Sequence, residues 1–540
     1  MTVAAATAGA LRAPRPAPSK WLVTLSVTFG TLMGAIDASI VNVALPQIRG
    51  AVGATVQEIT WISTGFAIAT VIVMPLTAFL GRLFGQKRVY LASLVLFVLG
   101  SALCGVATSL WTLVVARALQ GFGAGALQPT EQAILRQTFP PEEQGTAMAL
   151  FGMAVMIGPA VGPTLGGWIV DNFHWSWIFF INLPVGALGL FMVTRFVHEP
   201  EDIRAANAAA AARQRADMDW PGIALMAVGL AALQFFLEEG QQHDWFQSPA
   251  IAATAAVCAV ALGLFVWREL TAPVPAVNLR LFKDPVFTSS TLIGALMFAI
   301  LMASMFLLPL FMQELLGFTA MQSGLALMPR VLVMMVIVPI VGRLYRSVPA
   351  RILIAVGVLF IAWGAWLSSQ ITLETTSAGV IHAIMVQGAG FSFLFVPLTT
   401  VALSNVPRTK LTDATGLNSL LRQVGASMGL AIFATLLSRY GVEARHAVSS
   451  HVTVDRPEVG ERLAAMAGAF ASRGFDPVSA REAALRALDG MVTRQAMVIA
   501  FERVLLLTGA LFLLALPMLL FLKVKKVPAR IPPHAEPMEM

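Results

Sequence analysis

Long apolar runs, separated by polar segments, dominate the pattern of this chain. We count fourteen runs, each long enough for the helix of about twenty residues that spans a bilayer. They lie at roughly 20–46, 57–80, 88–107, 110–133, 147–170, 176–197, 219–238, 249–269, 286–313, 321–343, 351–370, 378–403, 413–438 and 499–522. The pattern therefore predicts an all-α, polytopic membrane protein.

Sequence motifs recur eight runs apart. The string Gly-Arg-Leu ends the second run at 81–83 and the tenth at 342–344, and Gln-Gly-x-Gly lies in the fourth run at 120–123 and in the twelfth at 387–390. A glycine ladder in the fifth run has a counterpart in the thirteenth. Two six-helix halves would place partners six runs apart, so two extra helices are predicted between the halves.

This repeat divides the chain into parts. They are an N-terminal tail (1–19), a six-helix bundle (20–197), a linker (198–218), two inserted transmembrane helices (219–269), a second six-helix bundle (270–525) and a C-terminal tail (526–540). The second bundle contains one long outside loop, 440–498. Its Ala, Arg and Glu content predicts amphipathic helices, with Ser479 and Glu482 as a capping box.

Composition and charge agree with a membrane protein. Apolar residues make up 57% of the chain and charged residues 12%, about half the charged share of a soluble domain. Lysine and arginine gather in the segments that face the cytoplasm if both termini lie inside, and the short outside loops hold only Arg49. The net charge of +7 is thus a topology signal and does not indicate nucleic-acid binding.

Four charged residues fall inside predicted spans, where each costs at least about 2.5 to 3.5 kcal/mol. They are Asp37, Arg117, Arg330 and Arg422. A carboxyl group takes up a proton more readily in a low-dielectric site, and a nearby cation opposes this. Motion that separates Asp37 from Arg117 would therefore couple conformation to protonation. For Arg330 and Arg422 a structural role, in an ion pair or bound to carbonyl groups, explains the sequence equally well.

Other acidic residues lie near span ends. We expect Glu131, Glu238, Glu239 and Asp413 to be solvated boundary carboxylates. No cluster of nucleophile, base or metal ligands is evident, so no catalytic residue, metal or cofactor is predicted.

Glycine and proline crowd one stretch of the fifth run. The residues are Gly158, Pro159, Gly162, Pro163, Gly166 and Gly167. In lipid such a helix survives when neighbouring helices pack closely against the missing side chains. The alternative is that any crowded membrane helix collects glycine.

Three further strings complete the pattern: Asp-Ala-Ser-Ile-Val-Asn-Val-Ala-Leu-Pro at 37–46, Leu-x3-Arg-x2-Gln-Gly-x-Gly at 113–123, and Trp-Ser-Trp-Ile-Phe-Phe-Ile-Asn at 175–182. With the glycine stretch, which matches the antiporter motif, they make the chain resemble the fourteen-span drug:proton antiporter branch of the major facilitator superfamily, of the EmrB and QacA type. The resemblance covers nearly the whole chain, with Ser176 in place of a usual arginine. It implies a major facilitator fold, alternating access, proton exchange at Asp37, and coupling or substrate orientation by Arg117.

The loop between the second and third runs departs from the superfamily pattern, because Arg82 stands where an aspartate is usual. The gating loop residues are Gly81, Arg82, Gly85, Lys87 and Arg88, and the charge network around them must differ from the aspartate form. Six polar residues are candidates for the cavity or for coupling: Asn42, Gln120, Arg330, Gln387, Asn418 and Arg422.

The sequence thus predicts a proton-coupled multidrug efflux antiporter in the bacterial inner membrane, with both termini cytoplasmic. The expected partners are amphipathic small molecules, protons, the lipid bilayer and, from the resemblance, a periplasmic membrane-fusion adaptor that docks on 440–498; a helical cap over the outer gate is the alternative for that loop. Rival functions are an exporter of one metabolite or antibiotic, a solute importer, a membrane sensor and a membrane enzyme.

Overall fold

A computed structural model describes residues 19–55, 57–201, 203–205, 207, 211, 218–453 and 455–522, apart from the side chains of 159, 160 and 320. Among these residues, 14 helices are long and apolar enough to cross a membrane, as the sequence predicts. The helices are α1 (Lys20–Val52), α2 (Trp61–Phe84), α3 (Gln86–Gly105), α4 (Leu110–Thr138), α5 (Gln144–Asn172), α6 (Trp177–Phe180), α7 (Asn182–Phe196), α9 (Trp220–Glu239), α10 (Pro249–Thr271), α11 (Pro285–Glu314), α12 (Ala320–Leu344), α13 (Ala350–Ser369), α14 (Ser377–Ala402), α15 (Leu411–Ser449), α16 (Pro457–Ala471) and α17 (Pro477–Leu513). α6 and α7 together form one span.

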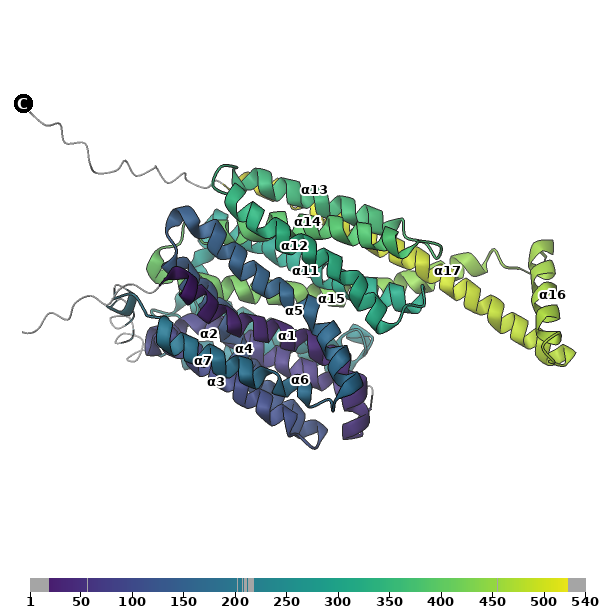
Figure 1. Ribbon diagram of the computed structural model, residues 1–540, viewed down its shortest axis with the longest axis horizontal. Coiled ribbons are helices and arrows are strands. Elements are labelled where there is room, and N and C mark those ends of the chain that lie inside the picture. Colours follow the sequence, from purple (N-terminus) through teal and green to yellow (C-terminus); the bar gives the residue numbers. More distant parts are fainter. Residues whose placement is uncertain are drawn as a thin grey trace, which may run out of the picture.

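The spans form two groups. Helices α1 to α7 pack on one another, and α11 to α15 pack with α17. Figure 1 shows the first group in purple and blue below and the second in green and yellow above. We call these groups the N-terminal half and the C-terminal half.

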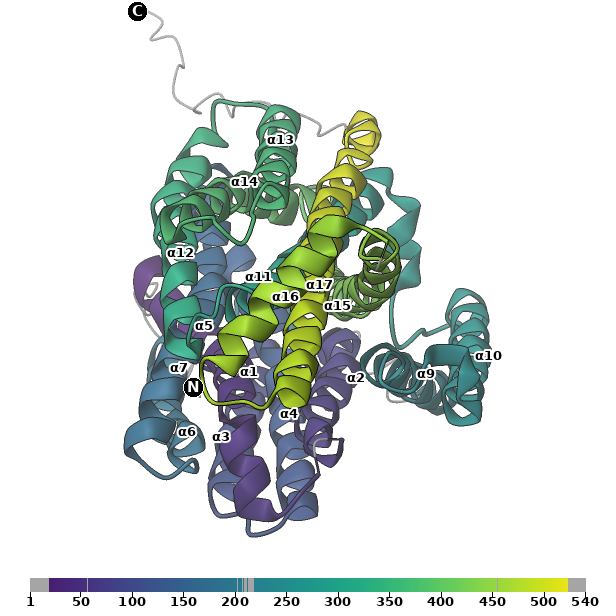
Figure 2. The same ribbon diagram turned by 90° about the vertical axis from the view of Figure 1, so that its right-hand side faces the viewer.

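The pair α9 and α10 lies outside both halves, beside α2 and α15 (Figure 2). Gln234 of α9 donates a hydrogen bond to Ser427 of α15 at 2.8 Å. At the other end of α9, Glu239 accepts hydrogen bonds from Thr60 at 3.2 Å and Thr64 at 3.4 Å, which belong to the start of the second span. The inserted hairpin therefore contacts both halves.

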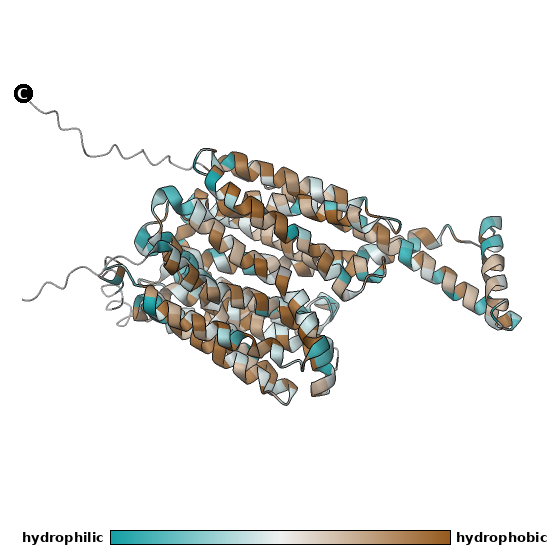
Figure 3. Cartoon of the chain, in the orientation of Figure 1, coloured by the Kyte–Doolittle hydropathy of each residue, from teal (hydrophilic) through white to brown (hydrophobic). Residues whose placement is uncertain are grey.

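One part of the C-terminal half extends beyond the bundle. Helix α15 continues to Ser449, α17 begins at Pro477, and α16 packs on α17 at the end opposite to the chain termini (Figure 1). Figure 3 shows that this extension carries more hydrophilic residues than the spans. We call the two ends of the molecule the terminus face and the α16 face.

The extension corrects two details of the sequence analysis. Helices α15 and α17 run past the predicted span ends at 438 and 499, because a helix can leave lipid and continue in water where its sequence turns polar. The predicted capping box, with Ser479 as the N-cap residue, is wrong. Asp476 caps α17 instead, and its carboxylate accepts hydrogen bonds from the backbone N–H groups of Val478 at 3.0 Å and Ser479 at 3.2 Å. The tails 1–18 and 526–540 and most of the linker 198–218 lie outside the described residues.

Candidate functional site

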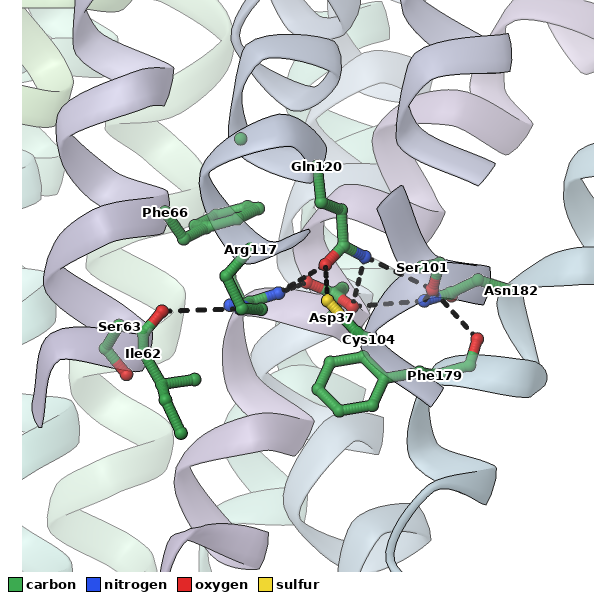
Figure 4. A network of polar contacts seen from close by, with 12 residues as sticks. Asp37, Ile62, Ser63, Phe66, Ser101, Cys104, Arg117, Gln120, Phe179 and Asn182 are labelled. Atoms are coloured by element: carbon green, nitrogen blue, oxygen red, sulfur yellow. Dashed lines mark hydrogen bonds and ion pairs between the residues drawn. The ribbon is translucent and has the colours of Figure 1, made fainter. Parts of the chain in front are cut away.

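An ion pair between Asp37 and Arg117 lies inside the N-terminal half (Figure 4). The Arg117 Nη1 atom is 2.5 Å from Asp37 Oδ2, and the two residues are 1% and 0% exposed. Asp37 comes from α1 and Arg117 from α4, so the pair joins two helices that are far apart in sequence. The sequence placed both charges inside the membrane, and the structure brings them together.

Amide side chains complete the surroundings of this carboxylate. Gln120 and Asn182 donate hydrogen bonds to Asp37 Oδ1 at 2.8 and 3.0 Å, and Gln120 accepts one from Arg117 at 2.7 Å. Ser101 accepts hydrogen bonds from both amides, at 3.3 and 3.0 Å. Both oxygens of Asp37 therefore have partners.

The guanidinium group is held between apolar walls. Its central carbon lies 4.1 Å from the ring centre of Phe66 and 5.8 Å from that of Phe179. Its Nε donates to the carbonyl oxygen of Ile62 at 3.4 Å. With water excluded, the attraction between the two charges is stronger than it would be at a surface, so protonation or separation of the pair changes the energy of the site substantially.

Asn182 was not among the site residues predicted from the sequence. It lies in the apolar string Ile-Asn-Leu-Pro at 181–184 and is 3% exposed. An amide inside a membrane helix needs a partner, and this was the signal that could have identified it.

A second polar network occupies the C-terminal half. Arg330 donates hydrogen bonds to Ser304 at 2.7 Å and Gln387 at 2.8 Å, and Gln387 donates to Ser368 at 3.2 Å. Gln387 and Ser368 follow Gln120 and Ser101 at the same distance in sequence, so the internal repeat extends to the two networks. Arg330 has no ion-pair partner among the described residues, and its Nε and Nη1 atoms have no hydrogen bond.

The remaining candidates are separate from these two networks. Arg422 and Asn418 on α15 are 6% and 1% exposed, with no hydrogen bond from Arg422 Nε or Asn418 Nδ2. Asn42 is exposed and accepts a hydrogen bond from Ser63 at 3.4 Å.

The glycine ladder of α5 packs against α1. A Cβ atom on Gly158 would collide with Ala35, one on Gly162 with Ser39, and one on Gly166 would lie 2.7 Å from Ile40. Across the same contact, Ser39 donates a hydrogen bond to the carbonyl oxygen of Gly158 at 2.9 Å.

The other members of the motif differ from the ladder. Gly167 has open space beside it, Pro163 is half-buried, and the Pro159 side chain lies outside the described residues. Three of the four glycines therefore hold α5 against the helix that carries Asp37.

The gating loop links the two halves at the terminus face. Arg82 Nη1 lies 2.6 Å from Asp413 Oδ1 at the start of α15, and Gln86 donates to Thr412 at 2.6 Å. A third hydrogen bond, from Arg408 to the carbonyl oxygen of Gln137, measures 3.1 Å.

The other loop residues make local contacts. Gly81 lies beside Thr412, Gly85 adopts a positive φ of 88°, Lys87 binds the carbonyl oxygen of Thr194 at 2.8 Å, and Arg88 is exposed. Direct contacts therefore connect the two halves at the terminus face.

The expectation of solvated boundary carboxylates is wrong for three of the four residues. Glu131, Glu239 and Asp413 are 0%, 4% and 8% exposed. Their side chains are buried because neighbouring helices pack against the ends of these spans. Glu131 accepts a hydrogen bond from Thr28 at 3.3 Å, and its second oxygen has no hydrogen-bond partner among the residues described. Glu238 is half-buried and accepts a hydrogen bond from Gln234 at 2.5 Å.

Within the described ranges no group of three or more His, Cys, Asp or Glu side chains could hold a metal ion. The site holds a buried charge pair and the polar amides of Gln120 and Asn182.

Comparison with known proteins identifies the family. Residues 27–430 match the family described as Major Facilitator Superfamily. The chain belongs to this superfamily. It is therefore a multi-pass membrane transporter rather than an enzyme.

Curated relatives cover most of the chain. The Fatty acid resistance protein FarB of Neisseria gonorrhoeae is 33% identical over 92% of this chain and 94% of its own. The Multidrug export protein EmrB of Haemophilus influenzae is 36% identical over 79% of this chain and 81% of its own length. The identities confirm an EmrB-type member of the superfamily.

Among solved structures, the human organic anion transporter MFSD10 has a TM-score of 0.59 at 14% identity, with 93% of this chain and 100% of that chain covered. At this identity the likeness concerns the fold, which confirms the predicted major facilitator architecture.

Proposed function

We propose that the protein is a proton-coupled multidrug efflux antiporter that exports amphipathic and hydrophobic toxic compounds by alternating access. The observation that carries the proposal is the buried Asp37–Arg117 pair, with its distance of 2.5 Å. A carboxylate that is paired in one conformation and unpaired in another binds protons with different affinity in the two conformations. This difference is what an antiporter needs to couple proton entry to substrate exit.

Protonation of Asp37 would replace its charge-assisted hydrogen bonds with weaker ones. The amides of Gln120 and Asn182, which donate to the same carboxylate oxygen, would then hold a neutral acid. Arg117 would be released from the pair and free to orient toward another acceptor. Because α1 carries Asp37 and also packs against the glycine ladder of α5, a proton at this site would act on the helix contact that the ladder forms.

We assign the terminus face to the cytoplasm. The distribution of lysine and arginine along the sequence supports this orientation. The described conformation is then one in which the Arg82–Asp413 and Gln86–Thr412 contacts close the cytoplasmic side. Breaking these contacts would open the substrate path toward the cytoplasm of a bacterial inner membrane.

The α16 extension would then project into the periplasm, where an adaptor protein could bind it. No α16 residue is buried in this structure, although the helix packs along α17. A helix with this exposure offers a surface for a membrane-fusion adaptor. The competing role is a cap over the outer gate.

The proposal is tested by transport in inverted membrane vesicles with a panel of amphipathic dyes, each measured with and without an imposed pH gradient. Gradient-dependent uptake of several unrelated dyes supports multidrug antiport, and the similarity to the Multidrug export protein EmrB of Haemophilus influenzae points the same way. Uptake restricted to a single compound would favour an exporter of one metabolite. Uptake that does not respond to the gradient would overturn proton coupling.

A further inference from the structure

The two halves carry unequal charge inside the membrane. In the N-terminal half the cation Arg117 is neutralised by Asp37. In the C-terminal half Arg422 is 6% exposed, its Nε atom has no hydrogen bond, and no described carboxylate lies within ion-pair distance of it. A buried charge without an ion-pair partner is unfavourable, so an anion bound beside this arginine would be stabilised.

Further polar groups on the same helix are also unsatisfied. Asn418 and Ser419 precede Arg422 by one helical turn and therefore lie on the same side of α15. They are 1% and 3% exposed, and neither Asn418 Nδ2 nor Ser419 Oγ has a hydrogen-bond partner in the part of the chain that the structure describes. Buried polar groups in proteins are nearly always hydrogen-bonded. Three donors without acceptors on one helix side indicate a binding position for a group rich in acceptors.

Aromatic rings surround the guanidinium group. Its central carbon lies 5.6 Å from the ring centre of Phe298 on α11 and 5.5 Å from that of Phe395 on α14. The Phe395 ring in turn lies 6.0 Å from Phe151 on α5, which belongs to the N-terminal half. The position therefore borders the contact between the halves, and its apolar walls suit the hydrocarbon part of a substrate.

The position is also deep in the membrane. Arg422 follows the first residue of α15 by about 16 Å along the helix, from a rise of 1.5 Å per residue. This is close to the middle of a hydrocarbon layer of about 30 Å. On α11, Gly294 faces Arg422, since a Cβ atom added there would lie 3.8 Å from Nε. The small residue keeps bulk away from the charge.

We propose that Arg422, with Asn418 and Ser419, forms an anion subsite for the acidic head group of amphipathic substrates. The inference rests on the proposed export function and names its substrate class: molecules with one negatively charged group on an apolar body. The arginine supplies the charge and hydrogen-bond donors, the two phenylalanines contact the apolar body, and the uncompensated cation disfavours amphipathic cations at the same position.

The test compares decanoate with decyltrimethylammonium, which share a ten-carbon chain and carry opposite charges. Binding of each to the full-length protein in nonionic detergent is measured by calorimetry, for the wild type, for Arg422→Gln and for Arg422→Lys. We expect the wild type to bind decanoate more tightly than decyltrimethylammonium. Arg422→Gln should bind decanoate at least about ten-fold more weakly than the wild type, which corresponds to about 1.4 kcal/mol. The affinity of Arg422→Lys for decanoate should lie between those of the wild type and Arg422→Gln. Binding of decyltrimethylammonium should not weaken in either variant.

Arg494→Gln is the matched control. Arg494 donates a hydrogen bond to the carbonyl oxygen of Leu315, in the connection between α11 and α12, and lies outside the subsite. Its affinity for decanoate should equal that of the wild type. Should Arg422→Gln fail to fold, Asn418→Ala keeps the cation and should still weaken decanoate binding selectively. Equal affinity of the wild type for both ligands, or an equal loss of both in Arg422→Gln, overturns the subsite.

Binding requires no proton gradient, so the two proposals fail separately. Selective decanoate binding without gradient-driven transport of any compound would overturn antiport and leave the subsite intact. Gradient-driven dye transport, with no preference for decanoate over decyltrimethylammonium in binding, would support antiport and overturn the subsite.

Discussion

Arg82 Nη1 lies 2.6 Å from Asp413 Oδ1 and thereby connects the last turn of α2 to the first turn of α15. Their side chains are 20% and 7% exposed. An arginine at the position where the superfamily usually has an aspartate is thus matched by an acid on the opposite half. The arginine that replaces the usual aspartate at position 82 is therefore accommodated by the carboxylate of Asp413.

Charge reversal should test this contact. Arg82→Asp or Asp413→Arg alone should weaken closure of the terminus face by about 2 kcal/mol, between the values for exposed and buried pairs. The double variant should recover most of that loss, because the pair is re-formed with opposite polarity. The measurement is the rate at which a maleimide labels Q137C, a position that is 7% exposed and contributes only its backbone carbonyl to the contacts between the halves, in a background without the two native cysteines. Labelling that is equally fast in the double and single variants would show that the pair does not control closure.

Asp37→Asn should abolish proton-coupled efflux while the protein still inserts and folds. The amide keeps the size of the side chain and some hydrogen bonds, but it cannot carry a proton. Efflux from inverted vesicles with an imposed pH gradient measures the effect, and counterflow exchange without a gradient is the control that transport itself survives. Full gradient-driven efflux in this variant would remove Asp37 from the coupling mechanism.

Arg117→Lys should also impair coupling, although less completely. Lysine keeps the charge but lacks the planar fork that lets Arg117 reach both Asp37 and Gln120, at 2.5 and 2.7 Å. We expect the apparent pH dependence of efflux to shift while expression stays normal. A Lys variant with wild-type rates and pH dependence would mean that a point charge is sufficient.

Gly162→Leu and Gly167→Leu form a matched pair within one motif. At Gly162 a side chain collides with Ser39, whereas Gly167 has open space. The first substitution should cost about 1 to 3 kcal/mol in helix packing, the usual penalty for overfilling a core, and should slow turnover. The second should leave turnover unchanged. Equal turnover in both variants, at equal expression, would reduce the ladder to ordinary packing.

Replacing residues 451–475 with a short glycine and serine linker removes α16 and leaves α15 and α17 in place. If α16 binds an adaptor, transport in vesicles should be retained and whole-cell drug resistance should fall by about the factor seen when the adaptor is absent. The two assays are run on the same strain. A vesicle defect as large as the loss of resistance would instead support the role of a cap over the gate.

The sequence predicted the spans and the buried charges well, because hydropathy and the cost of charge in lipid are properties of single helices. It predicted the Asp37–Arg117 contact only as a hypothesis, since two charges on different helices can meet or point apart. The partners contributed by neighbouring helices were not predictable in this way. Asn182 joined the site from α7, and Asp413 joined Arg82 from the other half, so each depended on how helices pack.

The burial of Glu131 and Glu239 shows the same limit. The position of both residues near the end of an apolar run predicts side chains exposed to water. In the structure both side chains are covered by other helices. The capping residue of α17 was missed for a local reason. Aspartate three residues ahead of Ser479 is an equally good cap, and the choice between them depends on where the helix begins.

The hairpin of α9 and α10 makes the two sides of the transporter unequal. Through Gln234 it contacts α15 and through Glu239 the start of the second span, so it covers the junction of the halves on that side. The opposite junction, between α5 and α12, has no such cover among the described helices. At that junction α5 packs directly on α12, where a Cβ atom on Gly145 would lie 2.7 Å from the carbonyl oxygen of Gly342. A hydrophobic molecule dissolved in the bilayer therefore meets a two-helix cover at one junction and the exposed seam of α5 and α12 at the other, and crosslinking by membrane-soluble probes should differ between the two sides.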